Sequence, residues 1–217
     1  MRKDALPATP TDPTLPQPGL RERKKRLRLQ RIQEAARALF LREGFQKTTI
    51  QDIARAADIG LGTLYLYAPS KEDLLVTVFR EPLLQLLDTA FEDAVTDAAL
   101  VDQLLAFFAV QLAWYRQEPA LARAILKELC FPATPTSQAD GCLIEQTTRA
   151  KLQALLLRAQ ARGVLPGGLH TATAASSILA LYHFHLQCWL GGHCAPELLA
   201  DRLRAALLQL LPGADRA

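Results

Sequence analysis

Apolar residues recur every three or four positions along the chain from Leu27 to Leu211. This spacing places them on one face of a helix, and no segment alternates apolar and polar residues long enough to indicate a strand. Hydrophobic residues make up 50% of the sequence, which is enough for a core. We therefore predict an all-α protein. Beyond residue 80 the expected helical segments are 83–97, 101–116, 119–130, about 139–162, 171–190 and 196–211, with Glu81-Pro82 as a kink or a boundary.

The N-terminal residues 1–20 are predicted to form a disordered, proline-rich tail. Five prolines stand among Thr, Ala and Asp there, a composition that buries too little apolar surface to offset the entropy of ordering. The tail also lacks the apolar stretch that a signal peptide needs. The four cysteines form no C-x-x-C pair. We expect a cytoplasmic protein.

Charge is divided unevenly along the chain. Residues 21–71 contain twelve basic and five acidic residues, a net charge of +7. Because the whole chain carries +3 and residues 1–20 are neutral, residues 72–217 carry −4. A basic surface confined to one part of a molecule is typical of proteins that bind nucleic acid or an anionic membrane, although a solvated helix face gives the same pattern.

The basic segment contains signals for three helices. A first helix ends at Gly44, and Phe45 can fold back onto its end. Thr49 is in the position of an N-cap, with Asp52 three residues later as in a capping box. This second helix is short and reaches Gly60, after which another short helix follows and Pro69 closes it. Two brief helices joined by a glycine-containing turn indicate a helix-turn-helix.

The run T-T-I-Q-D-I-A-R-A-A-D-I-G-L-G-T-L-Y-L-Y-A-P-S-K-E-D-L-L, at residues 48–75, resembles the helix-turn-helix of the tetracycline-repressor (TetR) family of transcriptional regulators. With the first helix, Arg28 to Glu43, the resemblance covers about fifty residues. It implies a DNA-binding domain at 21–71 and a helical ligand-binding and dimerisation domain at 72–217. The sequence departs from the family pattern at Asp58, where Gly is usual, at Gly60, where Ser commonly caps the recognition helix, and at Ala68, where an aromatic residue is usual. Loss of that cap costs about 1 kcal/mol.

Several side chains of this segment have the chemistry to bind DNA. The resemblance matches four residues to DNA-contacting positions: Thr63, Tyr65, Tyr67 and Lys71. It places Leu61 and Leu66 where the family varies its base-reading residues, and apolar side chains there suggest contact with thymine methyl groups. Three further positions are Thr49, Gly62 and Arg28. The hydroxyl of Thr49 and its nearby N–H groups suit a phosphate, and Gly62 permits close approach to the DNA. Arg28 belongs to a basic cluster from Arg21 to Arg31 that suits a flanking groove. For Tyr65, packing in the domain core is the alternative, whereas Leu64 is expected in the core.

The C-terminal segments suit a dimer interface. Residues 172–196 contain no Asp, Glu, Lys or Arg, but their Ser, Thr, His and Gln residues argue against a membrane span. Apolar residues lie on two sides of the helix at 171–190, so it needs partners on both sides. We expect this helix and 196–211 to pack against a second copy in a four-helix interface, the alternative being burial of both faces within one chain.

The resemblance also implies a small-molecule pocket inside the helical bundle. Eight residues on two helices supply aromatic walls and a few polar groups. They are Phe107, Phe108, Gln111, Trp114, Tyr115, Tyr182, His185 and Trp189. We expect a mostly apolar effector, and no cofactor. An ordinary aromatic core is the alternative for each of these residues.

Enzymatic motifs such as H-E-x-x-H, G-x-S-x-G and the P-loop are absent, so no catalytic residue is expected. A metal site built on His183, His185, Cys188, His193 and Cys194 has only two ligands, His185 and Cys188, on one helix face. We predict no metal site, with a metal- or thiol-responsive regulator as one alternative and a helical ligand-binding protein with non-specific nucleic-acid affinity as another. The main expectation is a homodimer on a palindromic operator that blocks transcription and is released by a ligand.

Overall fold

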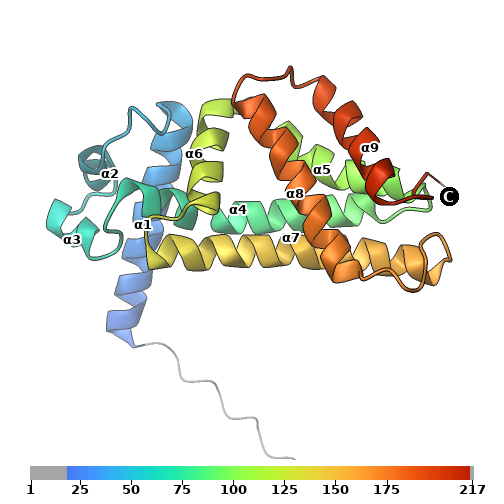
Figure 1. Cartoon of the computed structure of the whole chain (residues 1–217). Helices are drawn as coiled ribbons and strands as arrows, with labels where there is room; N and C mark the ends of the chain where they lie inside the picture. The colour runs from blue at the N-terminus through green and yellow to red at the C-terminus, as the bar shows by residue number, and fades with distance from the viewer. Residues whose placement is uncertain (1–18, 216–217) are drawn as a thin grey trace, which may run out of the picture.

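The structure is a computed structural model that describes residues 19–215, and within that range it contains helices and no strand (Figure 1). The predicted all-α fold is confirmed. The predicted N-terminal tail falls almost entirely on residues 1–18, outside the described part. The helices are α1 (Leu20–Arg42), α2 (Ile50–Ala56), α3 (Leu61–Tyr65), α4 (Lys71–Ala94), α5 (Leu100–Gln117), α6 (Pro119–Cys130), α7 (Pro135–Ala161), α8 (Thr171–Leu190) and α9 (Leu198–Leu210).

Helices α1 to α3 form a small N-terminal domain, and its buried residues belong to one hydrophobic core that continues through α4 into the bundle. Helix α1 ends as predicted, because Gly44 adopts a φ of +86° and the Phe45 ring returns to within 5.3 Å of the Phe40 ring centroid. Leu64 is fully buried and holds the five-residue α3 against the domain. Helix α1 begins at Leu20, seven residues before the first apolar position of the predicted pattern, since its early turns bury nothing and leave no apolar signature.

The turn between α2 and α3 combines a strong helix start with a strained exit. Thr49 caps α2, and the predicted capping box with Asp52 is present in both directions. At the other end Asp58 adopts a φ of +53°, a left-handed conformation that glycine adopts at little cost. Helix α3 then starts at Gly60 with no side-chain cap. The departures from the family pattern at Asp58 and Gly60 therefore cost local stability, but the turn between α2 and α3 still forms.

We expect Asp58→Gly to raise the free energy of unfolding by about 1 kcal/mol, because glycine removes the Cβ clash of the left-handed conformation. Urea denaturation measures the change. Asp58→Ala is the control: it keeps a Cβ at the same φ and should give no gain. A destabilised glycine variant would show that the Asp58 side chain, and not its backbone, matters at this turn.

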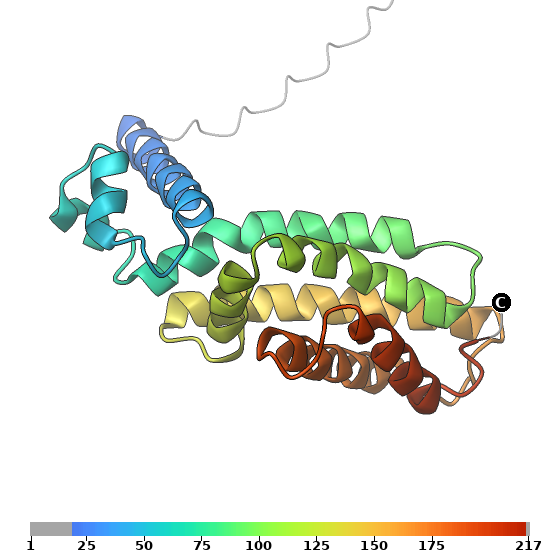
Figure 2. The same ribbon diagram turned by 90° about the horizontal axis from the view of Figure 1, so that it is seen from above.

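Helix α4 connects the two domains without a break (Figures 1 and 2). It runs through Pro82, so the expectation of a boundary at Glu81-Pro82 is wrong. The proline sacrifices one backbone hydrogen bond. Leu83 and Leu87 are buried directly after it and keep the second half of the helix packed. One continuous helix, packed on α1 at one end and on the bundle at the other, therefore links the two domains.

The second domain is a bundle built around α4 and α7, which lie side by side (Figures 1 and 2). Helix α4 also packs on α5, α7 packs on α8, and α8 packs on α9. Helix α7 begins at Pro135, four residues before the predicted start, because Thr134 caps it through a hydrogen bond from the Ser137 amide. None of the helices within residues 19–215 has the length and hydropathy needed to cross a membrane.

Candidate nucleic-acid interface and effector pocket

Helix α3 presents an apolar and aromatic face that no part of the described chain covers. Three of its residues, including its C-cap, are exposed: Leu61 by 37%, Tyr65 by 47% and Leu66 by 85%. Thr63 and Tyr67 are half-buried beside them. The structure thus places Tyr65 at the surface and not in the core. The five candidate DNA-reading residues Leu61, Thr63, Tyr65, Leu66 and Tyr67 all belong to this one short element and its C-terminal end.

Gly62 is not required by the fold. A Cβ built at this position meets no atom within 4 Å, and its backbone does not adopt a positive φ. Glycine inside a helix costs about 0.5–1 kcal/mol relative to alanine. Nothing inside the described part of the chain therefore requires glycine at position 62. Close approach of another molecule to the helix backbone would explain it.

Thr49 is already occupied by its capping role. Its hydroxyl accepts a hydrogen bond from the Asp52 amide at 3.2 Å and donates to the Asp52 carboxylate. The Thr49 amide also donates to that carboxylate at 3.2 Å. These hydrogen bonds and the nearby Arg55 lower the pKa of Asp52. Contact of the Thr49 side chain with a phosphate therefore competes with the capping box, and remains a prediction.

Lys71 is also held by the chain itself. Its ammonium group donates to the carbonyl oxygens of Phe45 at 2.8 Å and Thr48 at 3.0 Å and lies 4.3 Å from the centroid of the Phe45 ring. The charge therefore fastens the loop between α1 and α2 onto the start of α4. A phosphate contact by Lys71 would compete with these carbonyl groups, and it stays a prediction.

We expect Lys71→Met to lower the free energy of unfolding by about 1–3 kcal/mol, because two carbonyl groups lose a charged donor while the side-chain stem is kept. Lys47→Met is the control, since Lys47 is exposed in the same loop and its loss should change stability by no more than about 0.5 kcal/mol. Equal effects in chemical denaturation would contradict the structural role of Lys71.

The start of α1 is a basic helical extension, residues 20–28, exposed at every position. Six of its residues are cationic: Arg21, Arg23, Lys24, Lys25, Arg26 and Arg28. Within the described chain none of them forms an ion pair with an acidic residue at 4 Å or less. Arg28 lies on this extension and not on α3. The extension is a strong positive surface attached to the N-terminal domain.

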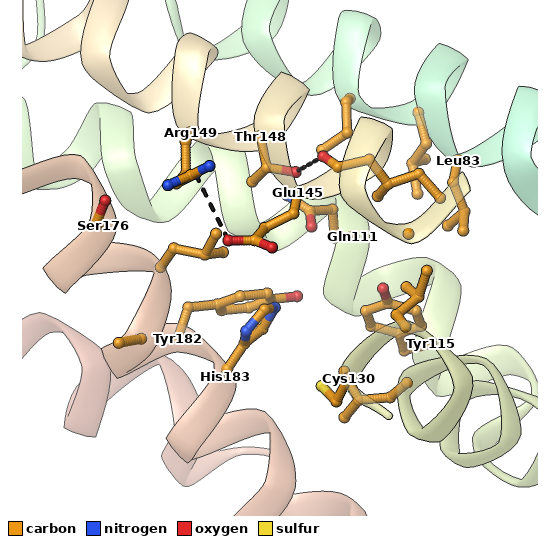
Figure 3. A pocket seen from close by; sticks show the side chains of 18 residues that line it. Leu83, Gln111, Tyr115, Cys130, Glu145, Thr148, Arg149, Ser176, Tyr182 and His183 are labelled. Atoms are coloured by element: carbon orange, nitrogen blue, oxygen red, sulfur yellow. Dashed lines mark hydrogen bonds and ion pairs between the residues drawn. The ribbon is translucent and has the colours of Figure 1, made fainter. Parts of the chain in front are cut away.

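A cavity of about 350 Å³ lies in the second domain between α4, α5, α6, α7 and α8 (Figure 3). Much of its wall is apolar, with Leu83, Leu86 and Leu87 from α4 and Leu126 and Leu129 from α6. Polar side chains enter it from α5, α7 and α8. The cavity matches the size and mixed character of a small-molecule site.

Three of the eight predicted effector residues line this cavity: Gln111, Tyr115 and Tyr182. Phe107 and Phe108 are buried in the core instead, where the Phe108 ring stacks on Tyr182 at 4.1 Å.

The other three residues also lie away from the cavity lining. Trp114 packs edge-on against Phe79, with ring centroids 5.8 Å apart. On α8, Ser176, Ala180 and His183 line the cavity together with Tyr182, whereas His185 and Trp189 do not.

The sequence reasoning missed a polar rim on α7 and α8. Glu145 and Arg149 line the cavity one helical turn apart, with an oxygen and a nitrogen 3.6 Å from each other. His183 faces them from α8, and burial lowers its pKa (Figure 3). Spacing of four residues between Glu and Arg also occurs on ordinary solvated helices, so only the packing reveals that this pair borders a cavity.

The cysteines and histidines do not gather into a metal-like cluster. Within residues 19–215, no group of three His, Cys, Asp or Glu residues is arranged to hold a metal ion. Cys130, Cys142, Cys188 and Cys194 are free thiols. Cys130 lines the cavity, and its pKa is raised chiefly by burial, which disfavours the reactive thiolate.

Hydrogen bonds at Asp73 and at Asp140 join α4 to the start of α7 beside the cavity. The buried Asp73 carboxylate accepts hydrogen bonds from the hydroxyls of Ser137 at 2.8 Å, Ser70 at 2.9 Å and Thr134. Two turns later along α4, Arg80 donates to the Asp140 carboxylate at 3.0 Å. The first residue of α7 that lines the cavity is Gly141, directly after Asp140. The contacts therefore lie between the cavity and the N-terminal domain.

Comparison with known proteins identifies both parts of the chain. Residues 32–78, which run from the second half of α1 through the first third of α4, match the family described as "Bacterial regulatory proteins, tetR family". The transcriptional repressor KstR of Mycobacterium tuberculosis is 27% identical over 200 residues, covering 91% of this chain and 84% of that protein. The fatty acid metabolism regulator protein of Bacillus subtilis is 30% identical over 82 residues, covering 38% of this chain but only 42% of that relative.

Solved structures share the fold across both domains. Thermus thermophilus FadR, a TetR-family repressor in complex with lauroyl-CoA, superposes with a TM-score of 0.66 at 24% identity, covering 84% of this chain and 92% of that one. Bacillus subtilis FadR in complex with stearoyl-CoA gives a TM-score of 0.65 at 22% identity, covering 85% and 98%. Residues 32–78 therefore match the tetR family of bacterial regulatory proteins in sequence, and the chain shares its fold across both domains with TetR-family regulators.

Proposed function

We propose that this regulator is a repressor that binds a palindromic operator as a homodimer in the cytoplasm and is released by a small, mostly apolar effector. One observation carries the proposal. An uncovered reading surface on α3, with a glycine that the fold does not need, is joined by the continuous helix α4 to a cavity in a separate domain. This arrangement suits a protein that must couple a ligand to DNA.

The α3 surface has the chemistry to contact a major groove. Leu61 and Leu66 offer apolar contacts to thymine methyl groups, and the hydroxyls of Thr63, Tyr65 and Tyr67 suit phosphates. Gly62 lets the helix backbone lie close to the DNA. In a dimer, two such surfaces reach successive major grooves about 34–36 Å apart.

The basic start of α1 adds a contact that does not read sequence. Its six cationic side chains, Arg28 among them, suit the phosphates that flank a half-site or an adjacent minor groove. The same surface favours the second candidate function, a helical ligand-binding protein with non-specific affinity for nucleic acid. The two functions differ in whether affinity depends on DNA sequence at a fixed salt concentration.

Helices α8 and α9 supply a surface for the proposed homodimer. They pack side by side, and Phe184 on α8 is 60% exposed, with Leu198 and Leu210 on α9 exposed by 45% and 37%. Large apolar side chains in water on two neighbouring helices favour association with a second copy. A monomer in sedimentation at micromolar concentration would contradict this part of the proposal.

The route from cavity to DNA runs through the start of α7. A ligand that moves the α7 wall at Ile144 or Thr148 also moves Ser137 and Asp140, which hold Asp73 and Arg80 on α4. Helix α4 then carries the N-terminal domain with it, since Lys71 fastens its loop. The effector need only bind the released conformation more tightly than the DNA-bound conformation by a few kcal/mol to cause release.

A long-chain acyl thioester is the effector class that we propose. The cavity wall formed by α4 and α6 is rich in leucine, and a polar rim is present at Glu145 and Arg149. Two solved proteins of the same fold hold lauroyl-CoA and stearoyl-CoA. The apolar chain of such a ligand suits the leucine-rich wall, and its polar, anionic head suits the polar rim.

Selection of bound duplexes from a random DNA pool, with purified protein at about 150 mM salt, tests the DNA-binding function. The expected product is a consensus with two inverted half-sites. Recovery of duplexes with no consensus, all bound with equal and salt-dependent strength, would support the non-specific alternative instead.

A further inference from the structure

Three hydrogen-bonding side chains meet inside the cavity. Gln111 and Tyr115 come from α5 and Tyr182 comes from α8, and their polar ends point toward the same central space (Figure 3). All three are buried, with exposed fractions of 6%, 7% and 1%. The Gln111 amide nitrogen donates to the Phe107 carbonyl at 3.3 Å, which orients its side chain.

The Tyr182 hydroxyl is the strongest sign of a missing partner. It is fully buried, and nothing within residues 19–215 forms a hydrogen bond with it. Its ring is already held by stacking on Phe108 at 4.1 Å, an interaction that phenylalanine would make equally well. Burying an unpaired hydroxyl is unfavourable. Packing therefore accounts for the ring of Tyr182 but not for its oxygen.

The interior of the cavity carries no charge at neutral pH. Burial raises the pKa of Tyr115 to about 12 and raises that of Tyr182 well above its ordinary value. Burial also lowers the pKa of His183. The charged lining pair, Glu145 and Arg149, is half-exposed at the rim. A carboxylate placed between the two tyrosines would have no cation beside it, whereas a neutral acceptor would meet two hydroxyl donors.

We propose that the hydroxyls of Tyr182 and Tyr115, with Gln111 beside them, bind the carbonyl oxygen of an acyl thioester or ester effector. This assignment rests on the proposed function and names the group that the pocket recognises. The acyl chain lies along the leucines of α4 and α6. Arg149, whose Nε forms no hydrogen bond in the described chain and whose contact with Glu145 is long at 3.6 Å, faces the anionic part at the mouth.

Binding of two matched ligands to the full chain tests the assignment. Lauroyl-CoA carries the carbonyl, and S-dodecyl-CoA has the same chain and head group with a methylene in its place. Calorimetric titration of the wild type should show lauroyl-CoA binding about tenfold more tightly, the value of about one hydrogen bond. Tyr182→Phe should reduce that preference severalfold, since Tyr115 and Gln111 keep their donors, while leaving the affinity for S-dodecyl-CoA unchanged.

The melting temperature separates recognition from structure. Tyr182→Phe keeps the stacked ring and removes an unpaired buried oxygen, so the free variant should melt no lower than the wild type. Equal affinities of the wild type for the two ligands, or a preference in Tyr182→Phe as large as that of the wild type, would overturn the assignment. If neither ligand binds while the protein still selects a palindrome, the acyl assignment is wrong and the repressor function stands.

Discussion

Gly62→Glu is expected to reduce affinity for the selected duplex at least a hundredfold while leaving the fold intact. An added Cβ meets no atom of the chain within 4 Å, so the new side chain extends outward from α3. There it places bulk and negative charge between the helix backbone and the phosphates. Fluorescence anisotropy at about 150 mM salt measures the affinity, and thermal melting followed by circular dichroism reports the fold.

Gly168→Glu is the matched control. Gly168 is exposed, meets nothing within 4 Å and lies in the loop between α7 and α8, in the other domain. It adds the same charge and bulk, so the two variants have equal net charge. Comparable DNA affinity of the two variants would show that α3 is not the reading surface, and would leave the basic start of α1 as the main contact.

The second large effect is expected at Asp73. Asp73→Ala removes a buried acceptor shared by the hydroxyls of Ser70, Thr134 and Ser137, and we expect the free energy of unfolding to fall by about 3 kcal/mol. Asp88→Ala, on the same helix, is the control. Asp88 is 65% exposed in its pair with Lys151, and surface pairs contribute about 1 kcal/mol or less. Urea denaturation gives both values, and equal losses would contradict the account.

Asp73→Asn addresses the role of the same contact in regulation. The amide keeps the volume of the side chain but weakens its hydrogen bonds to α7. We expect the variant to fold, to bind effector with wild-type affinity and to release DNA less completely when the effector saturates it. Full release by Asp73→Asn would show that the signal reaches α4 by another path, such as the α4 leucines of the cavity wall.

Local signals in the sequence were sufficient to predict the N-terminal domain. These signals act within a few residues of the chain, so each depends on the structure of a single turn. They are the capping box of Thr49 and Asp52, the left-handed Gly44 and the buried Leu64. The same holds for the bounds of α5, α6 and α8, which agree with the prediction to within one residue. Pro82 does not form the boundary that was one of the two expectations there, because tertiary packing of Leu83 and Leu87 outweighs the lost hydrogen bond.

Features that depend on distant contacts could not be read in this way. The anchoring of Lys71 could not be predicted, because its acceptors, Phe45 and Thr48, are more than twenty residues away. The cavity lining depends on the rotation of α8, which a helix apolar on two sides does not specify. Tyr182 was predicted to contact the effector, but the reason to single it out, an oxygen without a partner, appears only once its surroundings are known.

Release of the selected duplex by an acyl-CoA tests the central claim most directly. The wild-type protein is bound to the labelled selected duplex at about 150 mM salt, and lauroyl-CoA is added while anisotropy is followed. The account predicts a saturable fall to the value of free DNA, with coenzyme A alone causing none. If lauroyl-CoA binds to the protein but the complex stays intact, the cavity does not control the DNA-binding domain and the proposed coupling through α7 and α4 is wrong.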